Sequence, residues 1–171
     1  KKALNIEEID SIIPNEIPDE FEKVIYVPIL SYVQAGEFTD LSYLNGEELE
    51  YIPLPASEVP NNSFCMKVKG DSMVYDYSPT QRLKMEYSRF TINENEFVLV
   101  DTNQTNIDCL VGKVVVAHNG QGTTVKLAYE EEQGICLMPL NSRLQNDENI
   151  KRPHDARVIG RVIKVINQRS F

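Results

Sequence analysis

The feature that most constrains the fold is a succession of short β-branched runs that begins at residue 64. The first run, residues 64–69, alternates apolar and polar side chains, as a half-buried strand does. Asn119-Gly120 is a typical hairpin turn between two later runs. The other strand-like runs are residues 97–101, 111–118, 123–129, 135–140 and 158–166. Short strands at this spacing predict a mainly β domain, built as a compact, strongly bent sheet or a small barrel.

The N-terminal third has a different pattern. Residues 1–23 are an acidic arm in which Pro14 and Pro18 interrupt any amphipathic helix, so we expect a linker there. Residues 24–63 begin with a strand-like run and continue as a proline-rich stretch, which predicts a loop over 39–63. The compact domain is then expected over residues 64–171.

Residues 74–95 interrupt the β pattern. This segment carries tyrosines, both signs of charge and a proline. A structureless loop of that length is uncommon in a compact domain. We therefore predict a surface insertion with a structure of its own.

Charge and hydropathy exclude several classes of protein. The chain has 17 Lys plus Arg against 26 Asp plus Glu, a net charge of −9, whereas binding to the phosphate backbone needs clustered cations. No apolar run approaches the roughly 20 residues of a membrane span, and the start has no secretory apolar stretch. We expect a cytoplasmic protein without a membrane anchor. Because the chain does not begin with Met, we also expect a fragment that lacks its N-terminal part.

The cysteines and histidines do not predict a metal site. Cys65, Cys109 and Cys136 are widely spaced, without the paired spacing of metal ligands. His118 and His154 both fall in apparent turns. We expect buried structural thiols in a reducing compartment, with neither metal nor cofactor.

The first candidate for chemistry is the turn after the strand of residues 64–69. Gly70 allows the backbone to bend sharply, and Ser72 is then presented where the strand ends. The bend would leave the backbone N–H groups of Asp71 and Ser72 free to face an oxyanion. A serine in such a turn is more commonly a turn or capping residue than a nucleophile.

Two further elements can complete a site. Lys126 alternates with its neighbours Val125 and Leu127 and points to the opposite face of a strand, where it is either solvated or desolvated. A desolvated lysine loses its proton more easily and can act as a general base for a serine, without any histidine. Ala35-Gly36 lies upstream, on a segment predicted to be exposed, where small residues would let a backbone carbonyl enter a tight nucleophilic site.

Together these residues resemble the self-cleaving repressors of the LexA and phage-lambda class, a serine peptidase family that also includes UmuD. The resemblance covers about residues 24–171. Its motifs are Pro-Ile-Leu-Ser-Tyr-Val-Gln-Ala-Gly at 28–36, Val-Lys-Gly-Asp-Ser-Met at 68–73, and the runs 98–101, 112–117, 124–127, 138–141 and 158–163.

The resemblance implies a role for each candidate residue. It makes Ser72 the nucleophile, Lys126 the general base and Ala35–Gly36 the bond that the domain cuts in its own chain. It also implies a homodimer and a helix-turn-helix domain in the missing N-terminal part that binds operator DNA. A RecA filament on single-stranded DNA would accelerate the cut after DNA damage, and the cut would release the operator. Compact members of the family have a shorter connection in place of residues 74–95. Activation by a partner other than RecA therefore remains an alternative.

Other interpretations use the same residues. A UmuD-like polymerase accessory protein would lack a DNA-binding domain. A non-cleaving module would keep the fold only for dimerisation or for docking a partner, and a loss of Ser72 or Lys126 would have favoured it. A signal-peptidase relative would need a membrane anchor.

Overall fold

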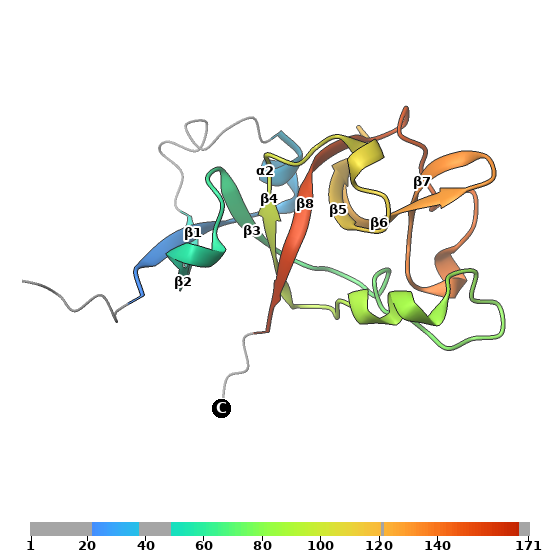
Figure 1. Ribbon diagram of the computed structural model, residues 1–171, viewed down its shortest axis with the longest axis horizontal. Coiled ribbons are helices and arrows are strands. Elements are labelled where there is room, and N and C mark those ends of the chain that lie inside the picture. The colour runs from blue at the N-terminus through green and yellow to red at the C-terminus, as the bar shows by residue number, and fades with distance from the viewer. Residues whose placement is uncertain (1–21, 38–48, 121, 168–171) are drawn as a thin grey trace, which may run out of the picture.

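The computed structural model describes residues 22–37, 49–120 and 122–167, and its main feature is one eight-stranded mixed sheet (Figure 1). The strands are β1 (Val24–Leu30), β2 (Glu50–Pro55), β3 (Ser63–Lys67), β4 (Phe97–Asp101), β5 (Val114–His118), β6 (Thr123–Glu131), β7 (Gly134–Met138) and β8 (Arg157–Ile166). Their order in the sheet is β2-β1-β3-β4-β8-β5-β6-β7. Among the described strands, only β1 and β3 pair in parallel. Within the described residues the edge strands β2 and β7 do not meet, so the mainly β fold is confirmed as an open sheet, not as a closed barrel.

The helical elements are short. They are the α-helix α2 (Tyr32–Glu37) and the 3₁₀ turns η2 (Ala56–Glu58), η3 (Met85–Phe90), η4 (Ile107–Cys109) and η5 (Ser142–Leu144).

The strand-like runs from residue 64 onward all form strands, with ends that shift by a few residues. Register shifts at Leu99/Val100 and at Val116/Ala117 interrupt the pairing of β8 with its neighbours. Such bulges bend a sheet.

Strand β2 corrects the prediction of a loop over residues 39–63. Its prolines, Pro53 and Pro55, alternate with Ile52 and Leu54, whose side chains are buried. Proline cannot donate to a strand ladder and is tolerated on an edge strand, which is the place of β2 in the sheet. The prolines therefore did not exclude a strand here. Residues 1–21, which make up most of the arm expected over 1–23, lie outside the described residues, as do residues 38–48.

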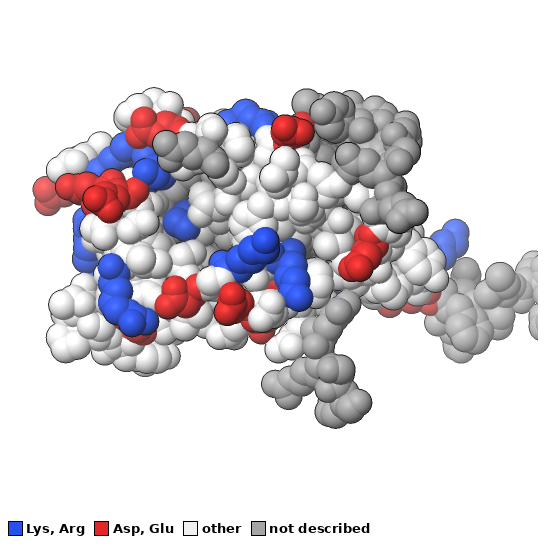
Figure 2. Space-filling model, turned by 180° about the vertical axis from the view of Figure 1, so that it is seen from behind, with Lys and Arg blue, Asp and Glu red and all other residues white. Residues whose placement is uncertain are grey.

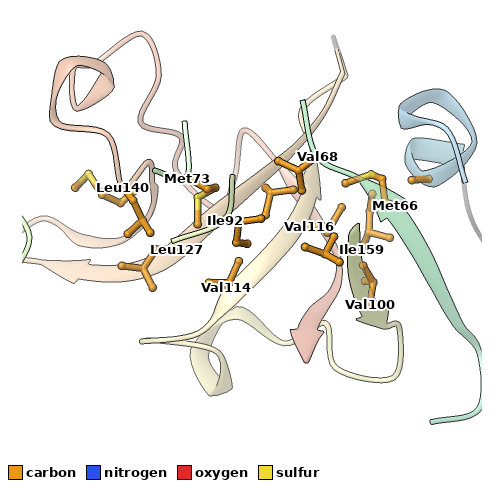
Figure 3. Close-up of a cluster of buried hydrophobic side chains, with 14 of the residues drawn as sticks. Met66, Val68, Met73, Ile92, Val100, Val114, Val116, Leu127, Leu140 and Ile159 are labelled. Atoms are coloured by element: carbon orange, nitrogen blue, oxygen red, sulfur yellow. The ribbon is translucent and has the colours of Figure 1, made fainter. Parts of the chain in front are cut away.

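The largest hydrophobic cluster gathers side chains from most strands of the sheet (Figure 3). Met66 and Val68 come from β3 and the residue after its end, and Val100 comes from β4. Met73, from the turn that carries Ser72, lies beside Leu140 in the same cluster. The core therefore anchors that turn on the sheet.

The segment 74–95 is only partly a surface insertion. Tyr75, Leu83 and Ile92 are buried in the main cluster. The Tyr75 hydroxyl donates to the Leu83 carbonyl at 3.0 Å, and the Ile92 N–H donates to the Met73 carbonyl at 2.9 Å. The segment therefore contributes side chains to the hydrophobic core around Met73.

The thiols differ from the expectation in one case. Cys65 and Cys136 are buried, and burial raises the pKa of their thiols to about 12 and about 11. Cys109 is exposed, which corrects the expectation of three buried thiols. Its short 3₁₀ turn lies at the surface, so its apolar neighbours in sequence do not enclose it.

The surface of the described part does not concentrate charge of one sign on the face drawn in Figure 2, where basic and acidic side chains are interspersed. Among the described residues, no helix is long and apolar enough to cross a membrane. The same part of the chain contains no group of three or more His, Cys, Asp or Glu side chains that could hold a metal ion.

Candidate active site

Ser72 lies in a turn that is held from several sides. Gly70 has a φ of +74°, in the left-handed region that glycine adopts without strain. The N–H groups of Leu140 and Asn141 donate to the Ser72 carbonyl at 2.8 and 3.2 Å. The Asn141 side chain donates to the carbonyl of Asp71 at 3.3 Å and to its carboxylate at 3.0 Å. The turn is therefore fixed by the chain that follows β7.

The backbone N–H groups of Asp71 and Ser72 have no acceptor among the described residues. The N–H of the preceding residue, Gly70, is used by the Glu94 carboxylate at 3.2 Å. Free N–H groups next to a hydroxyl are the donors that an oxyanion needs. The turn thus offers two such donors beside the Ser72 hydroxyl.

Lys126 is a buried amine whose hydrogen-bond acceptors are all neutral. Its side chain lies on β6, and the residue is 7% exposed. The Nζ atom donates to the Ser72 hydroxyl at 3.3 Å, the Thr124 hydroxyl at 2.6 Å and the Val125 carbonyl at 3.0 Å. Burial lowers the pKa of Lys126 from 10.5 to about 8, because the charged form loses its hydration. An amine with this pKa is partly neutral near pH 8 and can accept a proton.

The position of Lys126 follows from how the strands end. β7 ends at Met138, immediately before Pro139, and pairs with β6 only from Leu127 onward. Residues 123–126 of β6 therefore have β5 on one side and no strand on the other among the described residues. The chain that leaves β7 binds the Ser72 turn instead. This divergence brings Ser72 and Lys126 together.

The Ala35-Gly36 pair corrects the prediction of an exposed segment. Both residues lie in α2 and both are buried, with Ala35 at 0% exposure. The helix begins with a capping box, since the Ser31 hydroxyl accepts from the Gln34 N–H at 3.2 Å and the Gln34 side chain accepts from the Ser31 N–H at 2.8 Å. The Ser-x-x-Gln spacing is a local signal from which this helix could have been predicted.

Three side chains from the sheet lie against α2. The Arg157 guanidinium donates to the Gly36 carbonyl at 2.8 Å, and the Thr123 hydroxyl donates to the Tyr32 carbonyl at 2.7 Å. A Cβ atom on Gly36 would lie only 2.6 Å from Nδ1 of His118 and 2.8 Å from the Thr123 hydroxyl. Glycine is therefore required for this close approach.

The structure brings Ser72 and Lys126 within hydrogen-bond distance of each other. No hydrogen bond between described residues joins Ala35 or Gly36 to Ser72 or Lys126. Gly36 instead packs at Thr123, three residues before Lys126 on the same strand.

Sequence reasoning missed the residues that support the site. Thr124 could have been found, because it precedes Lys126 by two positions and so shares its face of the strand. Asn141, His118 and Arg157 gave no local signal, since their contacts join segments far apart in the chain.

Comparison with known proteins supports the family resemblance that the motifs indicated. The profile of the family described as Peptidase S24-like matches residues 28–163. The chain is 30% identical over 168 residues to the LexA repressor of Clostridioides difficile, covering 95% of this chain and 71% of that protein. It is 32% identical over 138 residues to the LexA repressor of an Exiguobacterium species, covering 78% of this chain and 57% of that protein. The LexA repressor of Pseudothermotoga lettingae is 23% identical over 144 residues, 84% of this chain and 62% of that protein.

An open, mainly β sheet that sets a serine hydroxyl beside a buried amine has the features of a serine-peptidase domain. The chain belongs to the Peptidase S24-like family, and its resemblance to the peptidase domain of LexA-type repressors is confirmed. Membership of this family implies serine peptidase chemistry in general terms. The chain spans 71% and 57% of the length of the first two relatives.

Proposed function

We propose that this chain is the self-cleaving and dimerising domain of a repressor, and that Ser72 cuts the chain's own Ala35–Gly36 bond. The observation that carries the proposal is the 3.3 Å between the Lys126 amine and the Ser72 hydroxyl. It is supported by the burial that lowers the pKa of Lys126 to about 8. The similarity to LexA repressors supports the repressor context.

The chemistry follows from the geometry of the dyad. Neutral Lys126 takes the proton of the Ser72 hydroxyl while its oxygen bonds to the carbonyl carbon of Ala35. The N–H groups of Asp71 and Ser72 then stabilise the tetrahedral oxyanion. When that intermediate collapses, the carbon–nitrogen bond to Gly36 breaks, and the Lys126 ammonium returns its proton to the leaving amine. A water molecule then hydrolyses the serine ester.

Thr124 orients the base in this scheme. Its hydroxyl and the Val125 carbonyl are the other acceptors of the Lys126 amine, at 2.6 and 3.0 Å. Two fixed acceptors hold the Nζ atom at the edge of β6. The third hydrogen-bonding direction of the amine therefore points toward Ser72. The base is thereby placed before the substrate arrives.

The open edge of β6 offers a place for an extended substrate. On the side away from β5, residues 123–126 pair with no other described strand. An extended peptide can add to such an edge as a further strand. We infer that the segment around Ala35–Gly36 leaves its helical conformation and pairs there when it is cut.

The cellular role belongs to the same proposal. In this role the domain would form a homodimer in the cytoplasm, and cleavage would separate it from a DNA-binding domain. With a net charge of −9, this chain is unsuited to hold operator DNA itself. A RecA filament on single-stranded DNA is the proposed activator after DNA damage.

The burial of Ala35 in α2 favours a second candidate, a non-cleaving module that serves only dimerisation or partner docking. A UmuD-like accessory protein would share the dyad with the first candidate. Observed self-cleavage would distinguish the self-cleaving repressor domain from the non-cleaving module.

The test is self-cleavage of the purified chain at pH 9.5, followed by mass spectrometry. We expect two fragments with a new end at Gly36, and no fragments from Ser72→Ala. Ser88→Ala, which removes a hydroxyl on η3, is the control and should cleave like the parent. Equal fragmentation in Ser72→Ala, or no fragmentation in the parent, would overturn the proposal.

A further inference from the structure

Residues 139–142 lie between the Ser72 turn and the segment 74–95. They follow β7, which ends at Met138, and they reach the first residue of η5. In Figure 1 the segment 74–95, drawn in green, passes beside η5, drawn in orange. We call residues 139–142 the brace, because hydrogen bonds hold this stretch both to the Ser72 turn and to the segment 74–95.

The peptide unit between Leu140 and Asn141 has a partner on each side. Its N–H, which belongs to Asn141, donates to the Ser72 carbonyl at 3.2 Å. Its carbonyl, which belongs to Leu140, accepts from the Gln81 side chain at 2.8 Å. A trans peptide unit is planar, and its N–H and carbonyl point in opposite directions. Gln81 is therefore linked to the backbone of Ser72 through a single rigid plane.

The Gln81 amide is itself fixed by a polar network. Its Nε2 atom also donates to the Asp76 carboxylate at 2.9 Å. Its Oε1 atom accepts from the Leu83 N–H at 3.1 Å and from the buried Gln145 side chain at 2.6 Å. Gln145 in turn donates to the carbonyl of Pro139 at 3.1 Å, at the start of the brace. Because the donor and the acceptor of the Gln81 amide both have partners, the amide has one preferred orientation.

Asp76 holds the other end of the brace. Its carboxylate accepts from the Ser142 N–H at 3.0 Å and from the Ser142 hydroxyl at 2.6 Å. Hydrogen bonds to an ionised acceptor are stronger than those between neutral groups. Asp76 and Gln81 together therefore fix the brace at Ser142 and at Leu140, from within the segment 74–95.

We propose that Gln81 and Asp76 are positioning residues for the Ser72 nucleophile and act on it through the brace. The inference rests on the proposed role of Ser72 as the nucleophile. The distance to be maintained is the 3.3 Å between the Lys126 amine and the Ser72 hydroxyl. A brace that moves away from the turn lets Ser72 shift, and both proton transfer and oxyanion binding depend on placement to a fraction of an ångström.

The first measurement is the rate of self-cleavage at pH 9.5 in variants of Gln81. Gln81→Ala removes the donor to the Leu140 carbonyl and should lower the rate about tenfold. Gln81→Glu keeps the shape but sets a carboxylate oxygen against that carbonyl and against the Asp76 carboxylate, so it should lower the rate further. A rate in Gln81→Ala equal to that of the parent would overturn the proposal.

The variants of Asp76 provide a rescue by a conservative change. Asp76→Ala should also lose about tenfold in rate. Asp76→Asn keeps an acceptor for the Ser142 N–H and should restore most of the parent's rate. If Asp76→Asn is as slow as Asp76→Ala, the hydrogen bond to the brace is not what Asp76 supplies, and its positioning role is overturned.

Tyr75→Phe is the matched control within the same segment. It removes the buried hydrogen bond from the Tyr75 hydroxyl to the Leu83 carbonyl, at 3.0 Å. In urea unfolding it should lose about as much stability as Gln81→Ala, because each loses hydrogen bonding in the segment, yet it should keep the parent's cleavage rate. If the control slows cleavage as much as Gln81→Ala, the rate follows the stability of the segment and the proposal is overturned.

The pH profile separates the placement of Ser72 from an effect on the base. In Gln81→Ala the rate above pH 9 should fall, while the midpoint of the profile should stay near pH 8, the pKa of Lys126. A midpoint that moves while the rate above pH 9 stays unchanged would overturn the proposal, because Gln81 would then act on the protonation of Lys126.

Labelling by a biotinylated fluorophosphonate measures the reactivity of Ser72 without the scissile bond. The serine oxygen bonds to phosphorus, fluoride leaves, and the hydroxyl proton passes to Lys126. Mass spectrometry should find the label on Ser72 in the parent, no label at this position in Ser72→Ala, and labelling about tenfold slower in Gln81→Ala. Tyr75→Phe should be labelled at the parent's rate.

Cleavage and labelling together distinguish a failure of this inference from a failure of the proposed function. If the parent is labelled but not cleaved, self-cleavage fails, and the labelling rates still decide the role of Gln81. If the parent is cleaved and labelled and Gln81→Ala matches it in both, only the positioning role is overturned. If the parent is neither cleaved nor labelled, both proposals are overturned.

Discussion

The Lys126 amine lies 3.3 Å from the Ser72 hydroxyl, although 54 positions separate the two residues in the chain. One residue comes from the turn after β3 and the other from the middle of β6. They meet where β7 diverges from β6 and its continuation binds the Ser72 turn. The amine is buried at this point, and its pKa is lowered to about 8.

The rate of self-cleavage should rise with pH between 6 and about 9 and then level off. In the proposed mechanism the neutral amine is the active form, and its pKa is about 8. An ordinary lysine, with a pKa of about 10.4, would give a rate that still rises at pH 10. Lys126→Arg should be inactive throughout, because guanidinium keeps its proton, and Lys126→Ala should be inactive while remaining folded.

The measurement for this prediction is the appearance of the fragment that begins at Gly36, followed from pH 6 to 10 for the three proteins. A flat profile for the parent, or clear cleavage by Lys126→Ala, would remove Lys126 from the mechanism.

The buried amine should also lower the stability of the fold at neutral pH. The folded pKa of Lys126 is about 8 and the unfolded value is 10.5, so between these values the unfolded chain binds more protons. The free energy of unfolding should therefore rise with pH across this window, and the full cost, about 3 kcal/mol, is present below pH 8. Lys126→Met should be more stable than the parent at pH 7 by up to that amount.

Urea unfolding at pH 7 and pH 10 checks this prediction. The gain from Lys126→Met should shrink at pH 10, where the parent amine is already neutral. Lys113→Met, which replaces an exposed lysine before β5, is the matched control and should show no such change between the two pH values. An equal gain at both pH values would contradict the lowered pKa of Lys126.

Asn141 should matter more for cleavage than for folding. Asn141→Ala removes the side-chain bonds to Asp71 but keeps the backbone bond from residue 141 to the Ser72 carbonyl. A nucleophile and oxyanion donors that shift by a fraction of an ångström lose about ten- to a hundredfold in rate. The loss of stability should be only about 1–2 kcal/mol.

The matched control is Asn103→Ala, which removes side-chain bonds to Asn61 and Asp101 at the far end of β4. It should lose similar stability in urea unfolding and keep the parent's cleavage rate at pH 9.5. Equal rates for the two variants would show that Asn141 has no special role at the turn.

Strand β8 should provide the dimer contact. Its residues 162–166 pair with β4, whereas β5 pairs only with Arg157–Arg161, so one edge of the C-terminal half is open among the described strands. Val165 in this half is 40% exposed. An open edge can pair with the same strand of a second copy about a two-fold axis. Sedimentation at micromolar concentration should show a dimer, and Val165→Glu should shift it toward monomer.

Met85→Glu, on η3, replaces another exposed apolar side chain and serves as the control. It should leave the dimer intact. A parent that sediments as a monomer at all concentrations, or a control that dissociates like Val165→Glu, would contradict a dimer through β8.

Local pattern was enough for much of the sheet. The period-two alternation of residues 64–69 and the β-branched run of residues 97–101 predict strands, because a strand with a buried face imposes that alternation within a few residues. Gly70 marks the sharp turn before Ser72, because only glycine takes its φ of +74° without strain. The motifs around Ser72 and Lys126 likewise indicated a serine and a lysine as candidate site residues.

The edge strand β2 was missed because Pro53 and Pro55 usually mark loops. Whether a proline is tolerated in a strand depends on whether a neighbour needs its N–H, and that depends on the place of the strand in the sheet. Helix α2 was missed for a different reason. Its capping box from Ser31 to Gln34 is local and readable, but a six-residue helix exists only with tertiary support.

The strands other than β2, the turn at Gly70 and the residue types at Ser72 and Lys126 could be predicted from the sequence alone, because each depends on neighbours a few positions away. Only the tertiary structure decided that Lys126 is desolvated, since the pKa of an amine depends on everything packed around it. It also decided that Ala35 is buried and that Gly36 meets Arg157, which lies 121 positions further along the chain. Such contacts are fixed by the packing of the whole sheet, and no local pattern encodes them.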